Sequence, residues 1–551
     1  MIDFQPMASR FQIFCRLAIS AASILVFASI AGAQAQPSSA PTGSEKAASR
    51  ALDYARKNPL VLRDFLVRMP KGADLHIHLS GEVYAESWIK DGAADGLCVD
   101  LKSFNFFAPD PPGANSSAPS SSNAAACPAS SVPVVKAFSD QDLYDQIVDA
   151  LSMRAFVPYA GESAHDHFFA TFAKFFAASR DHVPESLDEV ATRAAAQNEQ
   201  YLEIMDTPDF SHTAALAQKL GWNPDLAQFR EQLLASGLRD DVAVAQQEFD
   251  GAENGRRALE HCNDGQRQAA ACGVKTTFLY QALRGFPKEI VFAQLVLAFE
   301  VASADPANVV GVNIVMPEDG YISMSDYALH MQMFDFLHQK YPQVHISLHA
   351  GELAPGLVTY EGLCCHIRLA LEDGHAERIG HGVDIIYEKN PEALLKDMAA
   401  HHVMAEINLT SNDVILGISG ANHPFPIYRA HHVPVALSTD DEGVSRIDLT
   451  HEFQRAVETY NLNYSDLKTL ARTGIEHSFL PGQSLWREKD DFSRPVAACA
   501  SDKPRTAQKS AACAEFLKSN QKAAEQWKLE ERFAEFEASF TPPAHPAPAR
   551  Q

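Results

Sequence analysis

Between residues 73 and 439, short apolar runs alternate with stretches in which apolar residues recur every three or four positions. Runs of four to eight apolar residues are typical of strands buried on both faces of a parallel sheet, and the longer period is typical of helices. Eight runs fit the strand pattern: Ala73–Leu79, Tyr201–Met205, Val274–Gln281, Val309–Val315, His345–Leu348, Arg378–Gly380, Val403–Leu409 and Val433–Ser438. Eight strand and helix units predict a (β/α)8 barrel, an α/β fold. The alternative, an open doubly wound sheet, would call for a Gly-rich dinucleotide turn that the chain lacks.

The segments around this region divide the chain further. Residues 1–35 combine Arg10 and Arg16 with the apolar run Leu17–Ala31 and small residues, which is typical of a cleaved signal peptide; an uncleaved membrane anchor is the alternative. A linker and a helix, from about Ala47 to Val67, are expected over residues 36–68. The barrel is expected over residues 69–485, with a low-complexity surface insertion at about 98–135, and extra helices over 486–551. We therefore expect an exported protein, periplasmic or secreted, with no membrane contact after signal removal.

Composition narrows the classes of partner. Of the 551 residues, 46% are hydrophobic, which is enough for a large core and excludes a disordered chain. The formal net charge is −24, and so acidic a surface repels phosphate backbones. Nucleic acid is therefore not an expected partner, and a small neutral or cationic ligand is easier to accommodate.

The number of cysteines is consistent with an exported protein. Beyond Cys15 in the predicted signal, the chain has eight, an even number that suggests disulfides. The locally plausible pairs are Cys98–Cys127, Cys262–Cys272 and Cys499–Cys513, whereas Cys364 and Cys365 are adjacent and remain unassigned. No C-x-x-C pair occurs, so a cysteine-ligated zinc site is not expected.

The first candidate metal-binding residues lie on the first predicted strand. His76 and His78 are two positions apart, and such residues on a strand point to the same side, here the barrel interior. Two imidazoles side by side form half of a metal site, although two structural histidines are the alternative. The same spacing recurs at His165 and His167, but residues 165–177 have a helical pattern, on which such a pair diverges.

Three further motifs follow later strands. His349 can supply a third imidazole, and Glu352 lies just beyond it, where burial would raise its pKa and let it donate a proton. His381 lies between glycines that leave its ring accessible. Asp440 and Asp441 end the eighth strand: one would complete a metal shell and the other would face a substrate, with a helix N-cap pair as the alternative.

The joint placement of these motifs is more informative than any one of them. They fall at the carboxyl ends of strands one, five, six and eight, which a barrel brings together. Three histidines, one aspartate and an open position suit a single catalytic zinc ion, which lowers the pKa of a bound water to about 7. Another zinc signature, H-x-E with P-C-x-x-C, is absent.

These motifs, in this order, resemble the adenosine deaminases, and specifically their exported branch with an extended N-terminus. The similarity spans roughly residues 69–479 and includes Met69-Pro70-Lys71 ahead of the H-x-H pair. The resemblance implies that zinc is bound by His76, His78, His349 and Asp440. It implies that Glu352 protonates purine N1, that His381 orients or deprotonates the attacking water, and that Asp441 contacts N7. The substrate-contact positions correspond to Ser80, Gly81 and Met316, and Glu442 replaces the family's usual proline.

The expected reaction is hydrolytic deamination of adenosine, and of 2′-deoxyadenosine, to inosine-type products and ammonia. In this scheme a positively charged His381 stabilises the oxyanion that develops at C6. A two-metal amidohydrolase would need a lysine at the end of the fourth strand, and residues 309–319 contain none. Deamination of adenine, of a modified adenosine or of AMP, and a non-catalytic binding or signalling module, are the remaining alternatives. A homodimer formed through the N-terminal helix, as in the exported branch, is left open.

Overall fold

Eight parallel strands form the barrel that the sequence predicts. In the computed structural model, which describes residues 42–109, 127–504 and 509–541, they pair in the order β1-β5-β6-β7-β8-β9-β10-β11. Their bounds are β1 Gly72–His78, β5 Glu199–Asp206, β6 Lys275–Leu283, β7 Val309–Val315, β8 His345–Ala350, β9 Arg378–His381, β10 Met404–Ile407 and β11 Val435–Leu437. The barrel closes where Ile77 of β1 forms a parallel bridge with Asp440, just beyond β11. All eight predicted strands are thus confirmed, each with slightly different ends.

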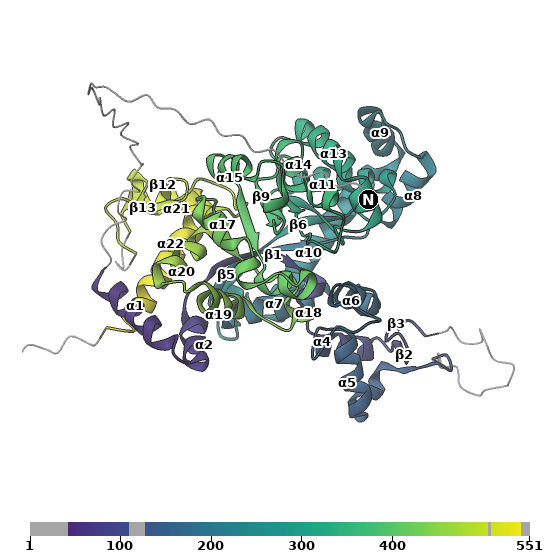
Figure 1. The fold of residues 1–551 in the computed structure, drawn as a ribbon, viewed down its shortest axis with the longest axis horizontal. Helices are drawn as coiled ribbons and strands as arrows, with labels where there is room; N and C mark the ends of the chain where they lie inside the picture. The colour runs from purple at the N-terminus through teal and green to yellow at the C-terminus, as the bar shows by residue number, and fades with distance from the viewer. Residues whose placement is uncertain (1–41, 110–126, 505–508, 542–551) are drawn as a thin grey trace, which may run out of the picture. The chain divides into compact units, whose positions relative to one another are not determined.

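The strands are covered by helices on the outside (Figure 1). Those that lie between successive strands are α8 Ser211–Leu220, α9 Leu226–Leu233, α10 Arg239–Leu259, α11 Lys288–Ala304, α12 Tyr321–Ser325, α13 Tyr327–Lys340, α14 His366–Glu372, α15 Pro391–Ala400, α16 Leu409–Leu416 and α17 Phe425–Ala430. After β11 come α18 Glu442–Ser445, α19 Leu449–Tyr460 and α20 Tyr464–Glu476. Every residue of β7 is buried, because its side chains alternate between the barrel interior and the helical layer. The main hydrophobic core therefore fills both the barrel and the space beneath the helices.

The connection from β1 to β5 is a folded insertion rather than a simple loop. It contains α3 Leu79–Glu82, α4 Ala85–Ala94, β2 Cys98–Asp100, β3 Phe106–Phe107, β4 Ser131–Pro133, α5 Gln141–Ala150 and α6 Ala164–Ser179, followed by α7 Val183–Ala196. The three short strands form an antiparallel sheet, and the predicted Cys98–Cys127 disulfide is present. A separate hydrophobic cluster that includes Trp88, Phe168 and Phe175 supports this part. The insertion is thus longer and more ordered than the low-complexity stretch alone indicates.

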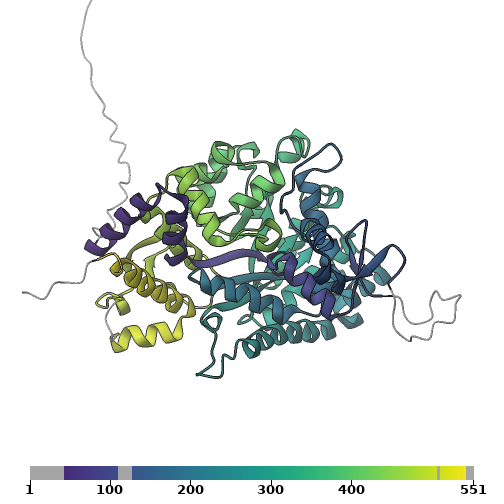
Figure 2. The same cartoon turned by 90° about the horizontal axis from the view of Figure 1, so that it is seen from below.

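The two ends of the described chain contact each other. The expected N-terminal helix is two helices, α1 Gly43–Ala55 and α2 Pro59–Arg68, because Asn58 caps a new helix whose first residue is a proline. The C-terminal part begins with an unpredicted hairpin, β12 Trp486–Glu488 and β13 Asp491–Pro495, before α21 Ala511–Ser519 and α22 Gln521–Ala538. Figure 2 shows α22 beside the first two helices, and ring contacts such as Phe65 on Phe536 join them.

The predicted signal peptide lies outside the described residues, which begin at residue 42. Within the described ranges, no helix has the length and hydropathy needed to cross a bilayer. The predicted Cys262–Cys272 and Cys499–Cys513 disulfides are both present, and Cys364 and Cys365 are bonded to each other.

Candidate metal centre and active site

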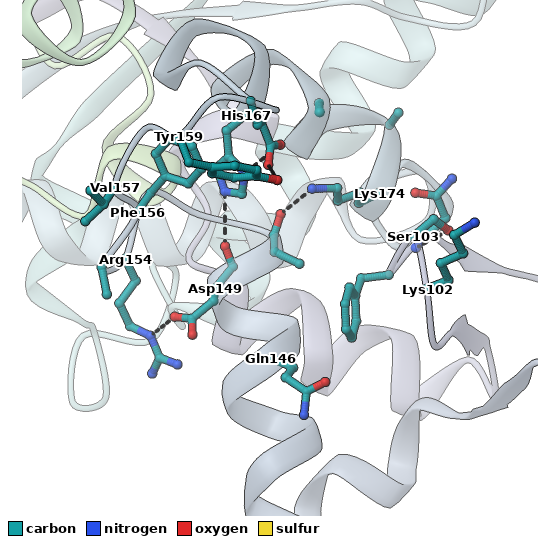
Figure 3. A pocket seen from close by; sticks show the side chains of 17 residues that line it. Lys102, Ser103, Gln146, Asp149, Arg154, Phe156, Val157, Tyr159, His167 and Lys174 are labelled. Atoms are coloured by element: carbon teal, nitrogen blue, oxygen red, sulfur yellow. Dashed lines mark hydrogen bonds and ion pairs between the residues drawn. The ribbon is translucent and has the colours of Figure 1, made fainter.

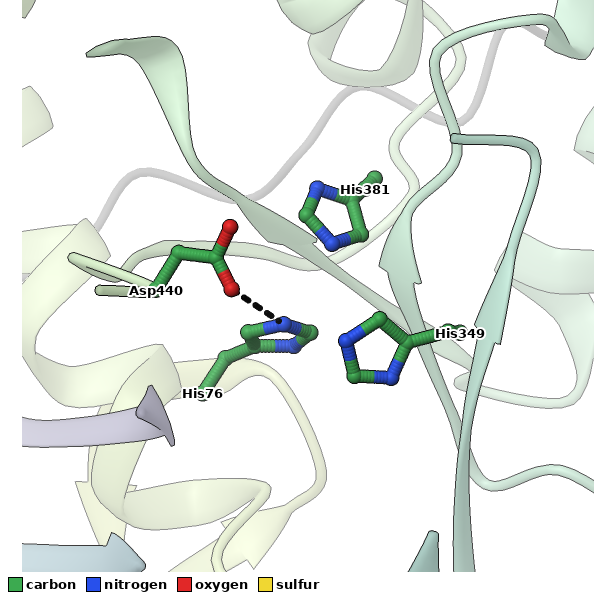
Figure 4. Close-up of side chains that lie close together, drawn as sticks. All are labelled: His76, His349, His381 and Asp440. Atoms are coloured by element: carbon green, nitrogen blue, oxygen red, sulfur yellow. Dashed lines mark ion pairs between the residues drawn. The ribbon is translucent and has the colours of Figure 1, made fainter. Parts of the chain in front are cut away.

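The H-x-H pair on β1 faces the barrel interior as predicted. His76 is fully buried and His78 nearly so, and the Nε2 atoms of the two rings lie 3.3 and 3.2 Å from Oδ1 of Asp440. The Nε2 atom of His78 is also 3.2 Å from that of His349, which is on β8. Figure 4 shows His76, His349 and Asp440 converging on one point, with His381 beside them. The four side chains expected to bind metal therefore meet, although they come from three distant segments.

Closure of the barrel places Asp440 opposite the two histidines. Its backbone N–H donates to the carbonyl of His76 and its carbonyl accepts from the N–H of His78, each at 3.0 Å. Asp440 adopts φ +69°, a left-handed conformation that turns the chain at this point. Burial alone would raise the pKa of its carboxyl, but the neighbouring histidine rings outweigh burial and hold the pKa well below its usual range. Asp440 is thus an anion aimed at the imidazoles.

Each of the three histidines has its Nδ1 atom held by a polar side chain from another strand. The partners of His76, His78 and His349 are Glu406 Oε2 at 2.6 Å, Gln281 Oε1 at 2.6 Å and Asn313 Oδ1 at 2.9 Å. An Nδ1–H that donates to an oxygen leaves the Nε2 lone pair free for a metal, and such partners fix the ring orientation. The Nε2 atom of His76 has no hydrogen-bond partner, although it is completely buried. The ring orientations therefore suit ligation at Nε2.

Glu352 follows β8 and points into the same space. Its backbone N–H and that of Gly351 donate to the two carboxylate oxygens of Glu318 at 2.8 and 3.0 Å. Its own Oε1 is buried without a hydrogen-bond partner and lies 3.7 Å from Nδ1 of His381. Burial, with the charges of Asp440 and Glu318, raises the pKa of Glu352 well above its usual value. A protonated carboxyl is thus available at this position, as the sequence suggests.

His381 ends β9 in a left-handed conformation, φ +67°, and is fully buried. Its Nδ1 accepts from the side-chain amides of Asn412 and Asn408 at 3.0 and 3.3 Å, and its Nε2 has no partner. Burial lowers the pKa of His381 to about 3. The ring is therefore neutral, and the expected positive charge on His381 is wrong, because two amide donors and a desolvated environment favour the uncharged ring.

Asp441 has a ligand atom within 4.8 Å of those of His78 and Asp440, and its buried Oδ1 has no hydrogen-bond partner. Gly81 has its Cα against this carboxylate, so that a Cβ built on Gly81 would be 1.6 Å from Oδ1 of Asp441. Burial and the charge of Asp440 raise the pKa of Asp441 well above its usual value. Asp441 therefore has a free polar atom for a ligand, and the glycine leaves room for it.

Five of these groups, His78, His349, Glu352, Asp440 and Asp441, line a cavity of about 340 Å³, whereas His76 and His381 are buried and are not among its lining residues. Its lining residues are His78, Ser80, Phe168, Phe169, Phe172, Gln281, Leu283, Val315, Met316, Pro317, His349, Glu352, Ile415, Asp440 and Asp441. The lining combines three carboxylic acids and two imidazoles with three phenylalanines of helix α6. The predicted substrate positions Ser80 and Met316 line this cavity, and Gly81 contacts it through Asp441.

A second cavity, of about 800 Å³, lies among α5, α6 and the loops at 102–105 and 154–159. Three of its polar side chains are paired within the protein (Figure 3): Lys174 donates to the carbonyl of Ala150, Arg154 pairs with Asp149, and His167 contacts backbone oxygens. Size alone would favour this cavity, but its lining lacks a converging set of metal ligands. The smaller cavity is therefore the candidate active site.

Comparison with known proteins decides the family. The family model described as adenosine deaminase matches residues 139–487, more than half of the chain. The chain belongs to the adenosine deaminase family. The matched region contains His349, Glu352, His381 and Asp440 but begins after β1, so the H-x-H pair lies outside it.

Individual members of the adenosine deaminase family show the extent of the similarity. The adenosine deaminase of Escherichia coli strain SMS-3-5 / SECEC is 31% identical over 155 residues, which are 28% of this chain and 42% of that protein. The match thus spans less than half the length of this relative. Among solved structures, the apo N6-methyl-AMP deaminase from Arabidopsis thaliana aligns with a TM-score of 0.48 at 20% identity, covering 76% of this chain and 94% of that one. An adenine deaminase from Arthrobacter aurescens aligns with a TM-score of 0.43 at 17% identity, covering 75% and 94%.

Sequence reasoning missed the residues that hold the candidate metal ligands in this member of the adenosine deaminase family. They are Gln281, Asn313 and Glu406, together with Ser411, whose hydroxyl donates to Oδ2 of Asp440 at 2.6 Å. Glu406 and Asn313 each interrupt an otherwise apolar strand, which was a usable signal, because a buried polar side chain needs a partner. The sequence could not show which partner each would meet across the barrel.

Proposed function

We propose that this chain is a zinc-dependent hydrolytic deaminase that converts adenosine, and 2′-deoxyadenosine, to the corresponding inosine and ammonia. The observation that carries the proposal is the meeting of His76, His78, His349 and Asp440 beside a cavity that His78, His349, Asp440 and Glu352 line. Family membership supports the hydrolytic deaminase class. The identity of the aminopurine rests on the cavity itself.

The residues present fit a single zinc ion. Three imidazole nitrogens and one carboxylate oxygen are donors that zinc accepts. Oδ1 of Asp440 lies 3.3 and 3.2 Å from Nε2 of His76 and His78, and Nε2 of His349 lies 3.2 Å from that of His78. Ligand atoms of His76, His349 and Asp440 also lie within 4.8 Å of one another, in a group that includes His381. Burial alone would lower the pKa of His76, but Asp440 and Glu406 outweigh burial and raise it to about 10. The carboxylates of Asp440 and Glu406 thus make the surroundings of His76 anionic, which suits a cation. When bound, zinc supplies Lewis-acid activation of a water molecule.

The surrounding residues then supply the proton transfers. Protonated Glu352 is placed to donate to purine N1 as electron density moves onto that atom during attack at C6. Nδ1 of neutral His381 accepts from two side-chain amides, so the ring hydrogen is on the unpartnered Nε2. His381 therefore orients the attacking water by donating a hydrogen bond to its oxygen. Protonated Asp441 donates to N7 of the purine, which accepts only. Ser80 and Met316 contact the remainder of the nucleoside on the cavity wall.

The cavity favours a substrate without phosphate. None of its lining residues is lysine or arginine, whereas three are carboxylic acids, so that a phosphate would meet no opposite charge. The α6 phenylalanines, with Leu283, Val315 and Ile415, present apolar surface to a neutral ligand. AMP and other nucleotides are accordingly expected to be poor substrates. Adenine would leave part of this apolar wall uncovered, which favours the nucleoside over the free base.

The test is a comparison of deamination rates on adenosine, adenine, N6-methyladenosine and AMP, each measured with and without a chelator. The proposal predicts the highest kcat/KM on adenosine, with chelator-sensitive loss of absorbance as inosine forms. Equal or faster turnover of AMP would overturn the substrate assignment. A pure protein that binds no zinc and deaminates none of the four would favour the binding or signalling module.

We also propose that the protein is exported, to the periplasm or beyond the cell. The proposal rests on the predicted signal in residues 1–35 and on the four disulfides among the described residues, which an oxidising compartment preserves. N-terminal sequencing of the protein recovered outside the cytoplasm tests it: a mature chain that starts near residue 36 agrees, and a cytoplasmic chain with its first 35 residues disagrees. Membership of the exported branch and dimer formation stay predictions.

A further inference from the structure

A line of contacts behind the active site leads from the Glu352 loop to the surface. Glu318, in the loop after β7, is buried and accepts the N–H groups of both Gly351 and Glu352, one on each carboxylate oxygen. Gly351 has φ +78°, so the chain turns sharply just before Glu352. Because Glu318 holds two consecutive N–H groups at that turn, it fixes the backbone of Glu352 and so the direction in which the Glu352 side chain points. Glu318 is thus a positioning residue that lies outside the cavity.

Glu318 is in turn held by His366. Nδ1 of His366 lies 2.5 Å from Oε1 of Glu318. The His366 ring is stacked on Tyr327, with centroids 3.7 Å apart and an interplanar angle of 2°, and the Tyr327 hydroxyl donates to the carbonyl of His366. Burial would raise the pKa of Glu318, but the His366 and Arg284 contacts outweigh burial and lower it to about 2. A displaced His366 would therefore loosen an otherwise firmly held carboxylate.

The position of His366 depends on the residue before it. His366 is the first residue of α14, and Cys365 is the cap, with φ +86°. A residue with a Cβ disfavours this conformation and persists in it only when the surroundings impose it. Here Cys365 is bonded to its neighbour Cys364, and the ring that closes over their shared peptide restrains the backbone. Both cysteines are half-buried, so a small reagent can reach them.

We propose that Cys364–Cys365 is a thiol-exchange site that controls the position of Glu352, so that a small dithiol lowers the turnover of the enzyme. One thiolate of the dithiol attacks a cysteine sulfur and forms a mixed disulfide, and its second thiol then displaces that cysteine. The Cys364–Cys365 bond breaks, the reagent becomes a cyclic disulfide, and two protons end on the two cysteines. An oxidised dithiol reverses the reaction.

Reduction removes the restraint on Cys365, whose φ is then free to return to negative values. The start of α14 moves with it, His366 withdraws from Glu318, and the N–H groups of Gly351 and Glu352 lose a fixed acceptor. The effect on rate rests on the proposed deaminase function, in which Glu352 is the proton donor. The effect on the backbone at Gly351 and Glu352 does not depend on that function.

Two double variants isolate the restraint. Cys364→Ser with Cys365→Ser removes the disulfide and keeps a Cβ at position 365, so it should behave like the reduced wild type. Cys364→Ser with Cys365→Gly also removes the disulfide, but glycine adopts φ +86° without strain and should preserve the oxidised behaviour. The glycine variant, treated with the same reductant, also controls for zinc chelation by the reagent and for reduction of the other three disulfides.

The experiment measures the full-length, zinc-loaded protein with and without dithiothreitol. Reduction of the wild type, and the serine variant, should lower kcat for adenosine roughly ten- to a hundredfold while KM changes little, because a misplaced proton donor weakens the chemical step. The glycine variant should keep its kcat in both conditions. Equal kcat in all three proteins, with mass spectrometry showing that the cysteine pair was reduced, would overturn the proposal, as would free thiols at both positions in the untreated protein.

Hydrogen exchange supplies a readout that needs no activity. The amides of Gly351 and Glu352 should exchange faster in the reduced wild type and in the serine variant than in the oxidised wild type or the glycine variant. If the oxidised protein deaminates nothing, the proposed function fails while this measurement still tests the link. Unchanged exchange at both amides on reduction would show that the Cys364–Cys365 disulfide does not control the Glu352 backbone, even in an active enzyme.

Discussion

The tripeptide His-x-His occurs twice in this chain, once on a strand and once on a helix, and the two copies do different things. On β1, His76 and His78 point to the same side, and both reach Oδ1 of Asp440. On α6, His165 contacts Asp319, whereas His167 turns to Glu162 and to backbone oxygens in the other cavity. The strand repeats every two residues and the helix every 3.6, so the same spacing brings one pair together and separates the other. A pair of histidines becomes half of a metal site only when the backbone and the opposite strand allow it.

The strongest test of this contrast is to remove one histidine from each pair. His78→Ala should lose most of the zinc and reduce kcat/KM for adenosine by at least about a thousandfold, because several kcal/mol of transition-state stabilisation depend on the metal. His165→Ala, the matched change on the helix, should keep one zinc per chain and stay within about tenfold of wild type. Metal analysis and initial rates on the same preparations check both. Similar losses of zinc and of kcat/KM in the two variants would show that the strand pair and the helix pair do not differ in metal binding.

Replacement of the proton donor separates metal binding from chemistry. Glu352→Gln keeps the side-chain volume but has no acidic proton, so kcat should fall by about a hundred- to ten-thousandfold with zinc content unchanged. Glu361→Gln, an exposed change in the short 3-10 helix Tyr360–Leu363 that follows the Glu352 loop, is the control and should leave kcat unaltered. An active Glu352→Gln enzyme would remove Glu352 from its proposed role.

The carboxylates that are hydrogen-bonded to the two histidine pairs should also differ in their effect on zinc affinity. Glu406→Gln weakens the hydrogen bond that orients His76, and should lower zinc affinity about ten- to a hundredfold. Glu162→Gln makes the same chemical change beside His167 and should not alter zinc affinity. Competition with a chromogenic chelator measures both dissociation constants. Equal affinities for the two variants would contradict the assigned ligand set.

A smaller effect on kinetics is expected from a substitution of Gly81, which follows the His76 and His78 pair in the chain. In Gly81→Ala the new methyl group would overlap Oδ1 of Asp441, so the carboxyl must move away from the substrate. KM for adenosine should rise about tenfold, with zinc retained, because one hydrogen bond from a buried group is lost. Steady-state kinetics with metal analysis test this, and an unchanged KM would show that Asp441 makes no contact with the purine.

The smallest effect concerns the helical pair and pH. Burial would lower the pKa of His165, but hydrogen bonds to Asp319 and Asp166 outweigh burial and raise it above 6.5. A raised pKa means that the ion pair is complete below pH 6.5 and is lost as pH rises through the folded value. The α6 amides should therefore be protected about two- to threefold more in wild type than in His165→Gln at low pH, and equally at high pH. Hydrogen exchange at matched pH values checks this, and a ratio independent of pH would exclude the ion pair.

Much of this architecture could be predicted because its signals are local. The apolar runs identify all eight strands, and the H-x-H, His349 and Asp440 motifs lie at strand ends that any closed parallel barrel gathers. Three disulfides also follow from short loops between cysteines. The remainder depends on which side chains meet across the barrel. Gln281, Glu406 and Glu318 are ordinary polar residues in the sequence, and only the folded chain places each beside a ligand or the Glu352 loop.

Local reasoning also failed where the environment changes a residue's chemistry. His381 was expected to be positively charged, but full burial and two amide donors make it neutral, and no spacing in the sequence reports burial. The break between α1 and α2 was visible in Asn58-Pro59 and was overlooked, whereas the hairpin β12–β13 has too few residues for a recognisable alternation.

A zinc titration tests whether His76, His78, His349 and Asp440 together hold one zinc ion that deamination requires. Protein freed of metal by a chelator is mixed with increasing zinc while the conversion of adenosine to inosine is followed. We expect no turnover without metal, a linear rise in rate, and saturation at one zinc per chain, with His349→Ala inactive throughout. Undiminished turnover by the metal-free protein, or saturation only at two zinc ions per chain, would contradict the account.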